Sequence, residues 1–267
     1  MTHGQTSVFP RHDILPPEHH AFICPRCFGF KQESYSYCYR CTGDFPLDAF
    51  LPMSYGWQTG SEYSLHTLIR RAKSRTSHHY DRYAGPSQRA YAYARLLVAL
   101  QSFVEHHERC LWRAAGLEER DLGPPWETPS DELTKVIAIP PSSPDDRHPW
   151  PFHALVGLVP HFSGRVCRGL EPTAKSSSEA RSVDCERFAA SWPPGAVEGK
   201  AVLLMDDVWT TGSTLKSCAQ LVRAAGATKV VGLVVERYLD PDWRGTKPHM
   251  PLVHSHSLAA GSCVLCA

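Results

Sequence analysis

The stretch from Val202 to Thr214 reads VLLMDDVWTTGST and decides the fold of the chain. It begins with four apolar residues, continues with the carboxylates of Asp206 and Asp207, and ends in a polar turn before a helical pattern. This order is typical of a buried strand, a turn and a helix. Because open parallel sheets bind ligands at the carboxyl ends of their strands, the sequence predicts that the two acids emerge where a substrate would lie.

The acids and the turn offer two kinds of contact. Two neighbouring carboxylates can accept hydrogen bonds from a vicinal diol, such as that of a ribose. The turn Thr210 to Thr214 presents hydroxyls and backbone N–H groups at a helix N-terminus, where the helix dipole favours an anion. Together they predict a site for a ribose 5-phosphate. The alternative is that Thr210 or Ser213 only caps a helix and that the carboxylates are a solvated strand end.

Strand and helix patterns alternate on both sides of this stretch. Apolar runs at 135–139, 201–205 and 229–235 are typical of buried strands, and helical patterns cover 65–72, 88–115, 152–159 and 213–225. The alternation predicts an α/β fold with a parallel sheet flanked by helices.

Four cysteines near the start of the chain form two C-x-x-C knuckles, Cys24 with Cys27 and Cys38 with Cys41. Four thiolates at this spacing can surround a zinc ion tetrahedrally, and such a site has no open position, so the zinc would be structural. Its binding free energy would fold a segment that is poor in aliphatic residues. The alternatives are a redox-active pair or incidental buried cysteines.

A third C-x-x-C pair, Cys263 and Cys266, follows His254 and His256 near the end of the chain. These four residues could bind a second metal, or the spacing is a coincidence in a flexible tail. We favour the coincidence. The remaining cysteines, which are typical of small buried apolar residues, are Cys110, Cys167, Cys185 and Cys218.

The thirteen residues quoted first resemble the signature of the type I phosphoribosyltransferases, and with the cysteine knuckles the chain resembles the ComF family of competence-associated phosphoribosyltransferase-like proteins from about Phe22 to Arg237. The resemblance implies that Asp206 and Asp207 are catalytic residues that hold the ribose diol of phosphoribosyl pyrophosphate, with magnesium as cofactor. The substrate-binding residues so implied are Asp206, Asp207, Val208, Trp209, Thr210, Thr211, Gly212, Ser213, Thr214, Pro141, Ser142 and Arg168.

Two further segments belong to the implied site. The turn from Pro140 to Ser143 follows the first strand of the alternating region, where such domains hold pyrophosphate, although it also fits an ordinary proline-rich turn. The segment 165–187, which contains Arg168, resembles the family's mobile loop, but its balanced charges also fit a solvated surface loop. In place of the family's Arg-Gly-Phe-Asn-Gln run, this chain has Arg147-His148-Pro149 and, later, Arg168-Gly169-Leu170, so the acceptor of the phosphoribosyl group stays unidentified.

Composition restricts the partners. The net charge of +1 argues against bulk electrostatic coating of nucleic acid. No apolar run approaches the roughly 20 residues that span a bilayer, and no export signal is recognisable, so a cytoplasmic location without membrane contact is the default. The rival hypothesis is a non-enzymatic sensor or adaptor whose basic helix, with Arg70, Arg71, Lys73 and Arg75, docks single-stranded DNA or a protein. We favour the enzyme. The oligomeric state does not follow from the sequence.

The expected domains follow these boundaries. Residues 1–20 form an irregular arm, 21–50 a zinc-ribbon module, and 51–245 a phosphoribosyltransferase-like domain with a helical insertion at about 80–116. Residues 246–267 form an irregular C-terminal tail.

Overall fold

Four apolar segments pair as parallel strands into one sheet, with the order β1-β6-β5-β2 across it. The bounds are β1 (Ala49–Gly56), β2 (Thr134–Ala138), β5 (Ala201–Trp209) and β6 (Lys229–Tyr238). The structure, a computed structural model, describes residues 20–57, 64–73, 86–124, 127, 129–130, 132–141, 152–174, 182–255 and 263–266. The strands are buried along almost their whole length because helices cover both faces of the sheet.

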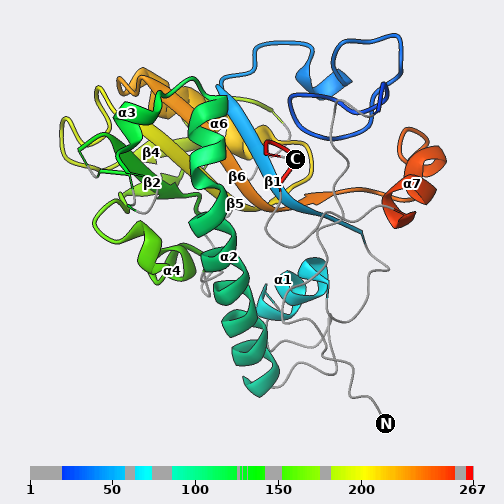
Figure 1. Cartoon of the computed structure of the whole chain (residues 1–267), viewed down its shortest axis with the longest axis horizontal. Helices are drawn as coiled ribbons and strands as arrows, with labels where there is room; N and C mark the ends of the chain where they lie inside the picture. Colours follow the sequence, from blue (N-terminus) through cyan, green and yellow to red (C-terminus); the bar gives the residue numbers. More distant parts are fainter. Residues whose placement is uncertain are drawn as a thin grey trace.

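Helices pack on the two faces of this sheet (Figure 1). The long helix α2 (Pro86–Ala114) crosses one face, with α1 (Leu65–Lys73) and α4 (Phe152–Gly157) packed against it. The other face is covered by α6 (Ser213–Ala224), which contacts β5 and β6. The smaller elements are α3 (Glu119–Leu122), α7 (Met250–Ser255), the antiparallel pair β3 (Leu170–Pro172) and β4 (Phe188–Ala190), and short 3-10 turns at Tyr39–Cys41, Pro160–Phe162, Cys185–Arg187 and Lys247–His249. The α/β fold class, with a parallel sheet flanked by helices, is therefore confirmed.

The observed elements differ from the sequence patterns mainly at their ends. β5 continues through both acids to Trp209, and β6 continues to Tyr238, because pairing with neighbouring strands holds their polar ends extended. β1 contains Pro52, which hides it as a strand in the sequence; it is tolerated because β1 lies at the edge of the sheet. The stretch 246–267, expected to be irregular, contains α7.

A buried ionic cluster fixes α2 to the β2 side of the sheet. Glu108 of α2 accepts hydrogen bonds from both terminal nitrogens of Arg165 (2.6 and 2.9 Å) and from His161 Nε2 (2.7 Å). Burial of Glu108 opposes ionisation, but the hydrogen bonds and positive charges of His161 and Arg165 outweigh it and lower the pKa of this carboxyl. Because the charges are paired and hydrogen-bonded, the cluster can lie in the core without an uncompensated charge.

Among the described residues, no helix combines the length and the apolar character needed to cross a bilayer.

Candidate functional site

Both acids of the decisive stretch lie at the carboxyl end of β5. The Asp207 side chain is buried and accepts from Lys73 Nζ at 2.6 Å. The backbone N–H of Asp207 donates to Asp206 Oδ1 at 2.9 Å. Lys73 is the last residue of α1, so the end of the basic helix lies at the acidic pair and contributes to this site.

The two carboxyls have unequal electrostatic surroundings. Burial raises the pKa of Asp206 to about 7, and the negative charge of Asp207 adds to this effect. The charge of Lys73 and the hydrogen bond from the Asp207 N–H oppose the rise. Asp206 therefore exchanges its proton near neutral pH, as groups in binding and catalytic sites frequently do.

The loop after β5 leads directly into α6, with Gly212 at the N-cap position. Gly212 has φ +76°, the left-handed conformation that glycine adopts without strain, and a Cβ atom there would lie 2.0 Å from Trp209 Cζ2. The hydroxyls of Thr211 and Ser213 are 3.1 Å apart across the loop. Gly212 itself makes no side-chain cap, and the Ser213 N–H donates to Thr211 Oγ1 at 3.4 Å, so the loop meets the positive end of the helix dipole of α6.

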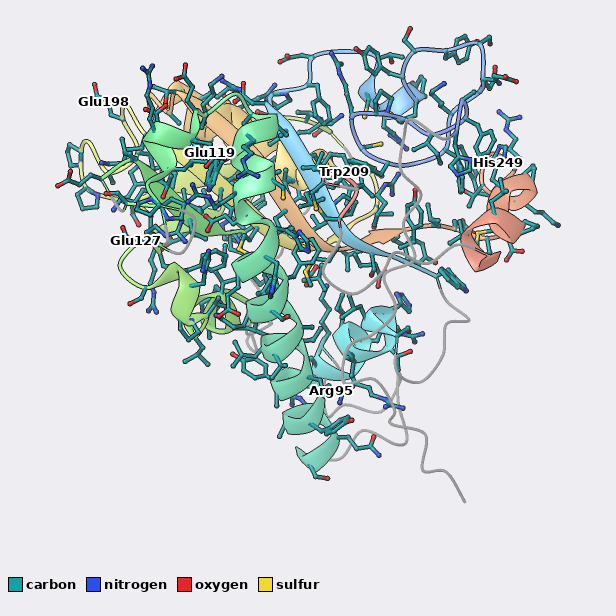
Figure 2. All side chains as sticks on the ribbon, viewed as in Figure 1. Arg95, Glu119, Glu127, Glu198, Trp209 and His249 are labelled. Carbon is teal, nitrogen blue, oxygen red and sulfur yellow. The ribbon has the colours of Figure 1, made fainter. Side chains whose placement is uncertain are left out.

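The side chain of Trp209 packs against Gly212 of this loop. It is only 1% exposed, and its ring packs on Phe50 of β1 with the ring centroids 4.4 Å apart. Figure 2 labels it in the middle of the molecule, next to β1. The Trp209 side chain, which the resemblance placed among the substrate-binding residues, therefore packs in the core.

The turn after β2 reaches the same edge of the sheet. Ala138 pairs with Met205, and the Ile139 N–H donates to the Met205 carbonyl at 2.8 Å, so Pro140 and Pro141 continue beside the acidic pair. Ser142 lies outside the described residues.

Arg168 lies beyond β2, on the side of that strand that faces away from β5. Val166 forms a parallel bridge with Val136 on the outer side of β2, and Arg168 follows it with an exposed side chain. Its guanidinium lies close to Gly157 of α4. The structure thus places Arg168 at the β2 side of the site. The middle of the segment 165–187, residues 175–181, lies outside the described residues.

Sequence reasoning missed a second charged pair, Glu236 and Arg237, at the carboxyl end of β6. Glu236 is fully buried, pairs in register with Val208, and accepts from His66 Nδ1 of α1 at 2.8 Å. The signal was present, because VVGLVVER repeats the pattern of an apolar strand that ends in charged residues.

The four cysteines of the N-terminal knuckles converge. The Sγ atoms of Cys24, Cys27, Cys38 and Cys41 all lie within 4.8 Å of one another, with Cys27 and Cys38 3.5 Å apart, and all four residues are buried. Zinc bound tetrahedrally at about 2.3 Å would hold its sulfur ligands about 3.8 Å apart, so this set of donors fits a structural zinc ion. We name it the knuckle centre.

The knuckle centre is docked onto the carboxyl edge of the sheet through Arg237. The guanidinium donates to the carbonyls of Cys27 (3.1 Å), Trp209 (3.0 Å) and Thr210 (3.1 Å). The Tyr55 hydroxyl donates to the Phe28 carbonyl at 2.6 Å. A single side chain therefore connects the knuckle centre to the loop that follows the acids.

Further contacts hold the same module. Lys216 of α6 donates to the Arg40 carbonyl, and Phe22 stacks on His249 with ring centroids 4.5 Å apart (Figure 2). Asp48, which precedes β1, accepts from the Val230 N–H and from Arg223, each at 2.7 Å. Hydrogen bonds therefore join the N-terminal module, and the segment between it and β1, to α6 and β6.

Comparison with known proteins found no matching family model, no matching curated protein and no matching solved structure.

Proposed function

We propose that the protein binds phosphoribosyl pyrophosphate together with magnesium and transfers the phosphoribosyl group to an acceptor, releasing pyrophosphate. The proposal rests on the sequence resemblance and on one observation: an acidic pair, a loop with a left-handed glycine and the start of a helix follow one another at the carboxyl end of a central strand. A diol acceptor and an anion site at that spacing match the two ends of a ribose 5-phosphate.

The expected roles follow from the chemistry of the groups. Asp206 and Asp207 accept hydrogen bonds from the ribose hydroxyls, and the loop Thr210 to Thr214 holds the 5-phosphate through N–H groups and hydroxyls. Cleavage of the bond to pyrophosphate develops positive charge on the ribose, which nearby carboxylates stabilise.

The leaving pyrophosphate would face the turn at Pro140 and Pro141. Magnesium would supply charge neutralisation on its oxygens, and carboxylates such as Asp206 and Asp207 are donors that this ion prefers.

Lys73 distinguishes this proposal from the adaptor hypothesis. Its ammonium is engaged with Asp207, so the end of α1 belongs to the acidic site and is not wholly available to a nucleic acid. When the ribose binds, the same lysine can stay beside the substrate and balance the charge of the carboxylates.

Calorimetry tests the binding step. We expect the Asp206→Asn/Asp207→Asn variant to lose roughly 1.5–3 kcal/mol of binding free energy for phosphoribosyl pyrophosphate with magnesium, as is typical of hydrogen bonds to charged groups. The matched control is Glu198→Gln, an exposed acid just before the same strand, at the opposite edge of the sheet (Figure 2). Equal affinity in wild type and the double variant would remove the ribose from this site.

Turnover tests the transfer step. Labelled phosphoribosyl pyrophosphate is incubated with a panel of nucleobases, amines, ammonia and small aromatic acids, and pyrophosphate release is followed. Acceptor-dependent release that the double variant lacks supports a transferase. Binding without release with any acceptor supports the sensor hypothesis instead.

A further inference from the structure

A second group of potential metal ligands joins the middle of α2 to the end of the chain. His107 and Cys110 are three residues apart on α2, so their side chains project from the same side of the helix. Cys263 and Cys266 are contributed by a short turn near the C-terminus, which Figure 1 marks near the upper part of α2.

The four donor atoms have the spacing of a filled coordination sphere. All lie within 4.8 Å of one another. The Sγ atoms of Cys263 and Cys266 are 3.3 Å apart, and Cys266 Sγ lies 3.6 Å from His107 Nδ1. A tetrahedral zinc ion with bonds of about 2.0–2.3 Å would separate such atoms by about 3.4–3.8 Å.

Burial of the turn requires something to hold it in place. Cys263 is 2% and Val264 6% exposed, and both belong to the hydrophobic core. Within the turn, the Cys263 N–H donates to Cys266 Sγ at 3.3 Å. Two thiolate bonds from the turn to an ion that is also held by two residues of α2 would fix the turn in this position.

We propose that His107, Cys110, Cys263 and Cys266 bind a second structural zinc ion, which fastens the C-terminal end of the chain to α2. Three thiolates and one imidazole are a frequent ligand set of structural zinc, and they leave no position for a substrate. We name this group the clasp centre.

The clasp centre replaces the second site considered from the sequence. His256 lies outside the described residues, as does the side chain of His254. The partners of Cys263 and Cys266 are residues of α2 instead. A disulfide between the two cysteines would use only half of the cluster, whereas a metal explains why His107 and Cys110 converge on the same point.

The clasp centre lies next to the buried ionic cluster of α2. His107 is followed directly by Glu108, the centre of the buried ionic cluster with Arg165 and His161. The zinc ion would therefore tie the chain end to the part of α2 that is already fixed to the sheet.

Elemental analysis of the full chain, purified under reducing conditions, tests the proposal. We expect two zinc ions per chain in the wild type, and one after Cys263→Ser/Cys266→Ser. The matched control is Cys167→Ser/Cys185→Ser, which changes two cysteines outside both clusters and should leave both ions in place. Equal zinc content in the wild type and the Cys263→Ser/Cys266→Ser variant would overturn the proposal.

A conservative variant excludes a loss of metal through misfolding. His107→Cys converts the ligand set to four thiolates, so it should keep the second zinc ion, whereas His107→Ala should bind it less tightly. Cobalt substituted into the wild type should give thiolate charge-transfer absorption from both centres. Absorption that Cys263→Ser/Cys266→Ser does not reduce would also count against the clasp centre.

Discussion

Asp206 and Asp207 are adjacent in the chain but have different charged neighbours. Asp207 has the ammonium of Lys73 at 2.6 Å. The pKa of Asp206 is raised to about 7 by burial and by its neighbour's charge. Near neutral pH, Asp206 therefore gains and loses its charge readily.

The first prediction concerns the pH dependence of substrate binding. A carboxyl accepts hydrogen bonds from a diol best when it is ionised, and Asp206 is mostly protonated below its raised pKa of about 7. Affinity for phosphoribosyl pyrophosphate with magnesium should therefore rise by about tenfold between about pH 6 and about pH 8, as measured by calorimetry.

Substrate phosphates also titrate in this range, so the comparison is with Asp206→Asn. That variant should bind more weakly at about pH 8 and lose the part of the pH dependence that comes from the carboxyl. The same pH profile in both proteins would contradict the assignment of this group.

The second prediction concerns Gly212. Gly212→Ala places a Cβ against the Trp209 ring in a backbone conformation that alanine disfavours. We expect a cost of about 1–2 kcal/mol for the conformation and about 1–3 kcal/mol for the overpacking, together with weaker phosphate binding.

Gly164 provides the matched control for Gly212→Ala, because it also has a positive φ (+78°) but no atom within 4 Å of a built Cβ. Urea unfolding should show only the conformational cost in Gly164→Ala. Equal destabilisation of both variants would mean that the Trp209 contact does not constrain the loop.

At the scale of elements, the carboxyl end of β6 organises the site. Arg237 donates to carbonyls of the knuckle centre and of the loop after β5, and Glu236 holds His66 of α1. The strand thus connects three parts of the chain that carry the proposed chemistry. Its two charged residues are positioning residues because they contact other protein groups.

The third prediction follows from these contacts. Arg237→Gln cannot reach all of the carbonyls and leaves buried acceptors unpaired, so we expect a loss of about 2–4 kcal/mol in the free energy of unfolding. Affinity for phosphoribosyl pyrophosphate should fall as well, because Trp209 and Thr210 lose their support.

The control is Arg244→Gln, an exposed arginine beyond the same strand. Both quantities should stay at the wild-type value in this variant. If Arg237→Gln destabilises the protein but binds the substrate with unchanged affinity, the connection to the loop has no functional role.

At the scale of the whole molecule, clusters of potential metal ligands lie near both described ends of the chain. The knuckle centre packs on the carboxyl edge through Arg237, Tyr55 and Lys216. The clasp centre would hold the C-terminal turn on α2. The N-terminal module therefore lies beside the loop that follows the acids and is not a separate appendage.

The fourth prediction follows from this arrangement. Cys24→Ser/Cys27→Ser should remove one zinc ion per chain, because each variant side chain replaces a thiolate of the knuckle centre. It should also weaken the binding of phosphoribosyl pyrophosphate, since the carbonyl of residue 27 no longer holds Arg237 in place.

Cys167→Ser/Cys185→Ser serves again as the control. Elemental analysis and calorimetry on the same preparations show whether metal and substrate affinity are lost together. Metal loss with undiminished affinity would separate the knuckle centre from the site.

Local patterns determined much of this protein. The run from Val202 to Thr214 predicted a strand, an acidic pair and a loop before a helix, and each lies there, because hydrophobic periodicity and turn chemistry act over a few residues. The first four cysteines were recognisable for the same reason, since their spacing is itself local. The alternation of strands and helices was enough to indicate the parallel sheet.

Tertiary structure decided what these parts touch. Cys266 meets His107 across 159 positions of sequence, and Arg237 meets the Cys27 carbonyl across 210. Lys73 reaches Asp207 only because α1 packs beside the end of β5. No local pattern encodes such pairs, since they depend on which faces bury one another when the sheet and helices pack. The sequence by itself therefore determined that an acidic pair and a polar loop follow β5. Only the packing of helices on the sheet decided that Lys73 lies beside this pair and that His107 and Cys110 meet Cys263 and Cys266.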